Sequence, residues 1–283
     1  MKLKVTPVAT VEDYLASTKR DTAKWEFNDS KLACPWYRGQ DRADSPTPKL
    51  FRGKGYREFE LTRMFRERSG AFGDVPEADR IDKWLFLMQH FGAPTRLLDW
   101  TESPLIALFF ALDSYRGRTP DEKYQSRPCV WALHPLILNL VAGVDGFPNT
   151  WTRRDGLAPG GRLANFNPGV EYFRLAFHPE SEWADQINLD IVKLAIAVQT
   201  SYVDLRMYSQ RSCFTIHGTG GHDIETIYAN GDYLRQEYLY KYEVQMNAVD
   251  SMYEDLGRLG ITRALVFPDF EGLASELEYR SRN

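Results

Sequence analysis

The stretch Gln89-His-Phe-Gly-Ala-Pro-Thr-Arg-Leu-Leu-Asp-Trp-Thr101 passes from a helix through a turn into a strand and gathers polar side chains on the way. Apolar periodicity upstream of it predicts a helix from Asp79 to about His90. Gly92 and Pro94 stand where residues beyond a helix C-terminus are expected, so the helix should end there. His90 therefore falls in a last helical turn.

The second half of this stretch predicts a buried strand at residues 96–100, because apolar residues dominate it. Ser103 and Pro104 then form an N-cap and first-turn pair for the next helix. Residues 105–112 of that helix are apolar on nearly every side, which predicts a central, buried helix.

Outward from this unit the pattern alternates between helix and strand signals. Helices are expected from Thr10 to Trp25, from Arg57 to Arg68 and from Val249 to Leu259. Strands are expected at residues 33–38, where Gly39 should end the strand, and at 130–134, 189–198, 212–217, 238–245 and 261–267. The predicted fold class is α+β, with mixed, mostly antiparallel sheets flanked by helices.

The 283 residues carry no fixed-period repeat and no clear linker, so we predict a single domain over residues 1–283 with a helical lead-in at 1–30. Residues 141–185 are rich in Gly, Pro, Asn and Arg and exceed an ordinary connection. This segment is expected to be an insertion that acts as a lid or a partner surface.

The composition is that of a globular protein, with 43% apolar and 26% charged residues and a net charge of −4. That charge argues against a surface that coats nucleic acid or anionic lipid without specificity. The three cysteines, Cys34, Cys129 and Cys213, show no paired spacing and indicate a reducing compartment. No apolar stretch is long enough to span a bilayer, so we expect a cytoplasmic protein with no membrane contact.

Two segments could carry chemistry, and the first is Trp36-Tyr-Arg-Gly-Gln40. Arg38 at a strand end can bind phosphate or ribose oxygens, and Gly39 would let a ligand approach the backbone. The plainer alternative is an exposed arginine before a turn glycine.

The second segment places His90, Thr95, Arg96, Asp99, Trp100, Thr101 and Ser103 among apolar neighbours. In a purely structural interpretation Arg96 pairs with Asp99, a hydroxyl caps the next helix, and His90 is satisfied at its helix end. In a functional interpretation the helix after Ser103 offers free N–H groups to a phosphate, and Arg38 faces it across a dinucleotide-sized cleft.

Several motifs together resemble the FRG-domain family. They are Tyr37-Arg-Gly39, Gln89-His-Phe-Gly92, Thr95-Arg-Leu-Leu-Asp-Trp-Thr101, Ser103-Pro-Leu with Ala107-Leu-Phe-Phe-Ala111, Gln210 before Cys213-Phe-Thr215, and Phe267-Pro-Asp269. FRG domains in turn resemble the ADP-ribosyltransferase fold, which implies NAD as a substrate and transfer of ADP-ribose to RNA, DNA or protein. The resemblance also implies a bacterial toxin or antiphage role and a restraining partner such as an antitoxin.

Carried onto this sequence, the resemblance implies that Arg38 and Gly39 hold NAD and that Asp99-Trp-Thr101 occupies the place of a Ser-Thr-Ser strand. The residues expected to take part in catalysis are Arg38, His90, Asp99 and Gln210. Those expected to bind the cofactor are Tyr37, Gly39, Gln40, Arg96, Trp100, Thr101 and Ser103. Tyr37, Phe91, Trp100 and Phe110 are candidates for aromatic walls that exclude water.

Gln210 departs from the transferase pattern, which has a glutamate there. An amide can bind a ribose hydroxyl, but it cannot act as a base or offset positive charge. Two alternatives therefore stay open: a non-catalytic module that binds a nucleotide or a protein, and a nuclease or hydrolase that pairs His90 with Asp99.

Two weaker signals are set aside. Cys213, His217 and His222 lack a fourth ligand, so we expect no metal site. The arginines at 153, 154 and 162, with Trp151 and Phe166, form a basic and aromatic mixture that is more typical of a solvated loop than of a nucleic-acid surface.

Overall fold

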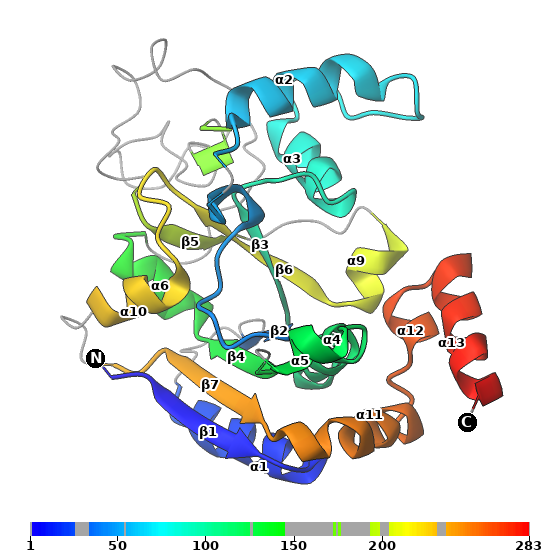
Figure 1. Ribbon diagram of the computed structural model, residues 1–283. Coiled ribbons are helices and arrows are strands. Elements are labelled where there is room, and N and C mark those ends of the chain that lie inside the picture. The colour runs from blue at the N-terminus through cyan, green and yellow to red at the C-terminus, as the bar shows by residue number, and fades with distance from the viewer. Residues whose placement is uncertain are drawn as a thin grey trace.

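The computed structural model describes residues 2–25, 34–53, 55–124, 127–144, 172–173, 175–176, 193–198, 204–230 and 236–282. Within them seven strands form one sheet in the order β1-β7-β4-β2-β3-β6-β5 (Figure 1). The strands are β1 (Lys4–Val8), β2 (Trp36–Gln40), β3 (Leu97–Thr101), β4 (Cys129–Leu133), β5 (Ala195–Val198), β6 (Ser212–His217) and β7 (Leu239–Val244). Only β1 and β7 pair in parallel, so the predicted α+β class with a mostly antiparallel sheet is confirmed.

Helices surround this sheet (Figure 1). They are α1 (Val11–Thr22), α2 (Glu58–Ser69), α3 (Ile81–His90), α4 (Pro104–Arg116), α5 (Pro120–Tyr124), α6 (Pro135–Val141), α9 (Leu205–Ser209), α10 (Ile224–Asn230), α11 (Val249–Arg258), α12 (Arg263–Val266) and α13 (Phe270–Arg282). None of the described helices is both long enough and apolar enough to cross a membrane.

The sheet is divided between β2 and β3. β2 pairs with β4, and β3 with β6, along their whole lengths. β2 and β3 pair only at Tyr37 and Thr101. The sheet therefore has a first half (β1, β7, β4, β2) and a second half (β3, β6, β5), which diverge beyond that one pair.

Three apolar clusters hold the layers together. The first packs α1, α4 and α11 on one face of the first half, around residues such as Tyr14, Phe109 and Met252. The second packs α6 and α10 on the opposite face and joins both halves through Trp100 and Trp131. The third packs α3 on the second half of the sheet. The split between the halves thus lies between the helices α4 and α3.

Helix α4 is central, as its apolar sequence predicts. The Ser103 hydroxyl accepts a hydrogen bond from Ile106 N at 3.3 Å and caps its N-terminus. Gly39 lets α4 lie directly on β2, since a Cβ at this position would stand 1.7 Å from the Ala107 carbonyl oxygen. The glycine is thus required by helix packing, whatever ligand approaches it.

Most predicted elements are confirmed to within a few residues at their ends. The Thr10 hydroxyl accepts a hydrogen bond from Asp13 N at 3.0 Å at the start of α1. Gly92, with φ of 74°, ends α3 in the left-handed conformation that glycine favours.

Some expectations were wrong or incomplete. β2 runs through Gly39 to Gln40, so the predicted break is wrong. The predicted last strand at 261–267 is the short helix α12, because the Thr262 hydroxyl caps it by accepting from Leu265 N. β1 was not predicted. Residues 189–192 and most of the 141–185 segment, including its arginines, lie outside the described residues.

Candidate functional site

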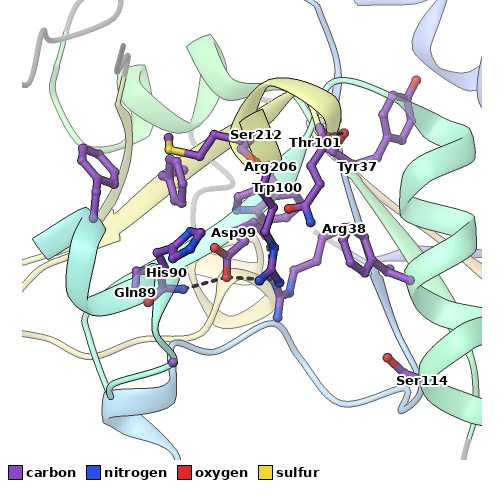
Figure 2. A pocket seen from close by; sticks show the side chains of 17 residues that line it. Tyr37, Arg38, Gln89, His90, Asp99, Trp100, Thr101, Ser114, Arg206 and Ser212 are labelled. Carbon is purple, nitrogen blue, oxygen red and sulfur yellow. Dashed lines mark hydrogen bonds and ion pairs between the residues drawn. The ribbon is translucent and has the colours of Figure 1, made fainter. Parts of the chain in front are cut away.

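A cavity of about 370 Å³ lies where the two halves of the sheet diverge, which is within the usual size range of ligand sites (Figure 2). Strands β2, β3 and β6 and helices α3, α4 and α9 contribute to its wall. The lining residues are Tyr37, Arg38, Gly39, Phe86, Gln89, His90, Gly92, Asp99, Trp100, Thr101, Phe110, Ser114, Arg206, Met207, Gln210, Ser212 and Phe214.

Arg38 on β2 connects the two halves of the sheet by contacting Asp99 on β3. Its Nη1 donates a hydrogen bond to the Asp99 carbonyl oxygen at 2.6 Å and lies 4.0 Å from Asp99 Oδ2. Its side chain is 16% exposed, and burial lowers the pKa of this guanidinium to about 10, although the Asp99 carboxylate counteracts the shift. Arg38 Nε is buried and finds no acceptor among the described residues. A partly desolvated guanidinium at the wall of a cavity is suited to bind an anion.

The Asp99 carboxylate lines the same cavity, between Gln89 on one side and Arg38 on the other (Figure 2). Gln89 Nε2 donates to Asp99 Oδ2 at 2.7 Å, while Gln89 Oε1 accepts a hydrogen bond from the Thr95 hydroxyl. The side chain of Asp99 stays 54% exposed. A fixed, solvent-accessible carboxylate is therefore available to a ligand.

His90 contacts a different carboxylate from the one that the sequence suggested. Its Nδ1 lies 3.2 Å from Asp204 Oδ2. Asp204 also caps α9, where its side chain accepts from Met207 N at 2.7 Å. His90 and Asp99 both line the cavity, but the carboxylate that the His90 ring contacts is that of Asp204.

The far wall comes from α9 and its C-terminus. Gln210 lines the cavity, and its Nε2 donates to the Val266 carbonyl oxygen at 3.1 Å. The Gln210 carbonyl oxygen accepts from the Thr101 hydroxyl at 2.6 Å, which ties α9 to β3. The next residue, Arg211, has a φ of 49°, an uncommon value for a side chain other than glycine. Gln210 is thus held in place by hydrogen bonds with Val266 and Thr101.

Eight of the eleven predicted site residues line this cavity, and three do not. Arg96 is buried, donates through Nε to Glu58 Oε1 at 2.8 Å and through Nη1 to the His217 carbonyl oxygen at 2.7 Å. The predicted Arg96–Asp99 pair is therefore wrong. The two residues stand three positions apart, and side chains an odd number of positions apart along an extended segment point to opposite faces. Arg96 instead contacts Glu58 on α2.

The other two outside the cavity are Gln40 and Ser103. Gln40 Nε2 donates to the Arg42 carbonyl oxygen at 2.9 Å. Ser103 caps α4, and its own N–H donates to the Thr101 hydroxyl at 3.0 Å. Pro104 has no N–H, and the N–H groups of Ser103 and Ile106 are engaged, so the first turn of α4 does not present the row of free N–H groups expected for a phosphate site.

The aromatic walls also differ from the expected set. Tyr37 and Trp100 reach the cavity but are buried in the core, and the Trp100 indole donates to the Thr215 hydroxyl at 3.1 Å. Phe91 is 71% exposed and lies outside the cavity. Phe110 lines the cavity, as do Phe86 and Phe214. The ring centroids of Phe86 and Phe214 lie 4.8 Å apart.

Sequence patterns assigned no role to several lining residues, above all Gln89, Arg206 and Met207. Gln89 belongs to the polar helix-to-strand turn, so its position was a usable signal. Arg206 sits in a segment that carries no motif, and only the fold brings it to the cavity. Among the described residues no group of three His, Cys, Asp or Glu side chains is arranged to hold a metal ion.

Comparison with protein families gives one result for this region. Residues 34–119 match the family model of the FRG domain. No curated protein and no solved structure matches the chain.

The FRG match runs from just before β2 through α4, so it includes Arg38, Gln89, His90 and Asp99. It ends before α9, and the Gln210 and Phe267 motifs lie outside it. The family match assigns no activity. The cavity itself combines the partly desolvated guanidinium of Arg38, the oriented carboxylate of Asp99 and an apolar wall.

Proposed function

We propose that the cavity binds NAD and that the protein is an ADP-ribosyltransferase. One observation carries this proposal: Arg38 and Asp99 lie side by side in a cavity between the two halves of the sheet. The Asp99 side chain there is 54% exposed. A guanidinium suits the diphosphate or ribose oxygens of NAD, and a carboxylate suits the positive charge that develops on the ribose.

In the proposed reaction the bond between nicotinamide and ribose breaks, and nicotinamide leaves with the bonding electron pair. A nucleophile of the acceptor bonds to the same ribose carbon and loses a proton. Asp99 offsets the oxocarbenium-like charge, as carboxylates do in glycoside cleavage. The apolar side chains of Phe86, Phe110 and Phe214 limit access of water, which would otherwise compete as the nucleophile.

The acceptor in this proposal is a macromolecule, either RNA, DNA or protein. The resemblance set out above suggests a toxin or antiphage effector that an antitoxin or other regulatory protein restrains.

A second candidate function is nucleotide binding without turnover. It is favoured by the Gln210 side chain, which cannot act as a base and whose amide is engaged with the Val266 carbonyl oxygen. It is also favoured by the hydrogen bond from Gln89 to the Asp99 carboxylate.

The test combines binding and turnover in one preparation. Purified protein is incubated with NAD labelled in the adenosine portion, with cell protein, RNA and DNA offered separately, while nicotinamide release is measured. We expect label transfer to one acceptor class, loss of NAD binding in Arg38→Gln, and loss of turnover with retained binding in Asp99→Asn. Arg258→Gln, a 73% exposed charge-matched control on α11, should behave as wild type.

Each other outcome has a defined meaning. NAD binding without nicotinamide release or transfer would favour the non-catalytic module. Cleavage of RNA or DNA without incorporation of label would favour the hydrolase alternative. Absence of NAD binding would exclude the ADP-ribosyltransferase, and the second candidate would then require another nucleotide.

A further inference from the structure

Arg206 gives the cavity a second cation. It lies on α9, whose N-terminus is fixed by the Asp204 cap, and it lines the cavity together with Arg38 of β2 (Figure 2). The Arg206 side chain is half-buried, and no carboxylate among the described residues forms an ion pair with it. Two guanidinium groups therefore border one cavity, and Asp99 is the carboxylate that lines it with them.

The ring of Phe267 contacts the Arg206 guanidinium. Arg206 Cζ lies 4.8 Å from the ring centroid, within the distance of a cation–π interaction. Arg263 Cζ lies 5.0 Å from the same centroid, and Arg263 Nη1 is fixed by Asp113 Oδ2 at 2.5 Å. A guanidinium that rests on an aromatic ring keeps fewer orientations than a free one.

Phe267 is itself held firmly. The Phe110 ring, which lines the cavity, meets it edge-on at a centroid distance of 5.9 Å. Gly272 of α13 packs so closely on it that a Cβ there would stand 2.1 Å from the Phe267 carbonyl oxygen. The preceding residue, Val266, accepts the Gln210 amide at 3.1 Å. The segment at 266–267 thus contacts three cavity residues: Phe110, Arg206 and Gln210.

We propose that Arg206 and Arg38 together bind two linked phosphate groups, and that Phe267 is the residue that positions Arg206. This inference deepens the proposed function, because NAD carries such a diphosphate, but the site it names would bind any ligand with two linked phosphates. It also gives Phe267 a role that its place outside the FRG match does not reveal.

The first experiment titrates the full chain with inorganic pyrophosphate and, separately, with NAD. Arg206→Gln is expected to weaken both affinities by about tenfold, the size of one charge-assisted hydrogen bond. Arg258→Gln, which makes the same change on exposed α11, should leave both unchanged. Equal pyrophosphate affinity in wild type and Arg206→Gln would overturn the proposal.

The second experiment tests the positioning role through a double-mutant cycle. Phe267→Leu should weaken pyrophosphate binding in the wild-type background but not in Arg206→Gln, because the residue it positions is already gone. Phe267→Tyr keeps the ring and should restore the affinity. Independent losses in the two backgrounds, or equal losses for Leu and Tyr, would show that Phe267 acts only on the fold.

The two ligands separate this inference from the proposed function. Pyrophosphate binding that depends on Arg206, without any binding of NAD, would support the diphosphate site and exclude NAD as its substrate. Failure of pyrophosphate to bind would overturn the inference, and NAD binding and nicotinamide release would then decide the proposed function separately.

Discussion

Arg38 and Arg96 show how two arginines of the same protein differ in their surroundings. Arg96 is nearly fully buried and its donors are matched by the Glu58 carboxylate and a carbonyl oxygen. Arg38 has its pKa lowered to about 10 by burial and keeps a donor without an acceptor among the described residues. The first arrangement is structural, whereas the second costs stability and is typical of a binding site.

These surroundings predict opposite effects on stability. Arg96→Met leaves the Glu58 carboxylate unpaired and should lower the free energy of unfolding by about 3–5 kcal/mol. Because the lowered pKa of Arg38 means that the folded state disfavours its charge, Arg38→Met should raise the free energy of unfolding by about 1 kcal/mol. Urea denaturation at pH 7 measures both. A loss of several kcal/mol in Arg38→Met would assign Arg38 a structural role as well.

At the residue scale, the sequence predicted that the polar side chains of residues 89–101 cluster, but it did not predict which groups they pair with. Arg96 and Glu58 stand 38 positions apart, and His90 and Asp204 are farther apart still. Pairing over such separations depends on how α2, α3 and α9 pack, which no local pattern encodes. The predicted Arg96–Asp99 pair was wrong for this reason.

At the scale of elements, boundaries set by local chemistry were predictable. Thr10 and Ser103 cap helices through their own hydroxyls, and Gly92 ends one through its left-handed backbone. The apolar run at 261–267 fits a strand or a buried helix equally well, and only its contacts decide. There it packs against α9 and α13, and it is not part of the sheet formed by the described strands.

The contact between β2 and α4 predicts that Gly39 tolerates no side chain. In Gly39→Ala the new Cβ would stand 1.7 Å from the Ala107 carbonyl oxygen and 2.7 Å from Ala111 N, so backbone must move. We expect the free energy of unfolding to fall by at least about 3 kcal/mol, the upper end of ordinary overpacking.

Gly257 provides the matched control for this substitution. It lies within α11 with open space around its Cα, so Gly257→Ala should stabilise the protein by up to about 1 kcal/mol. Chemical denaturation compares the two variants. Similar stability of Gly39→Ala and wild type would mean that α4 is free to shift away from β2.

At the scale of the whole molecule, the two halves of the sheet are joined by more than the Tyr37–Thr101 pair. The second apolar cluster spans both halves, and within it the Trp100 indole donates to Thr215 of β6. The Thr215 hydroxyl in turn lies 3.4 Å from His217 Nε2. A buried imidazole is thus part of the packing that holds the second half together.

This imidazole makes global stability depend on pH. Burial lowers the pKa of His217 to about 3, and the positive charge of Arg96 nearby adds to the shift, although His217 Nδ1–H donates to the His222 carbonyl oxygen at 2.8 Å. In the unfolded chain a histidine pKa is about 6.5. Between these values the unfolded state binds a proton that the folded state does not, so stability is complete above about pH 6.5 and falls as the pH drops.

The expected slope is about 1.4 kcal/mol per pH unit between pH 6 and pH 4.5, above the range in which most carboxylates titrate. His217→Gln should remove this dependence of the unfolding free energy on pH. It should also lower the unfolding free energy at pH 7, because the hydrogen bonds of the ring are lost. His222 is an exposed neighbour, and His222→Gln should leave the pH dependence unchanged. Urea denaturation at a series of pH values gives the slopes directly. An unchanged slope in His217→Gln would show that another group controls acid unfolding and that the His217 ring can be protonated within the folded protein.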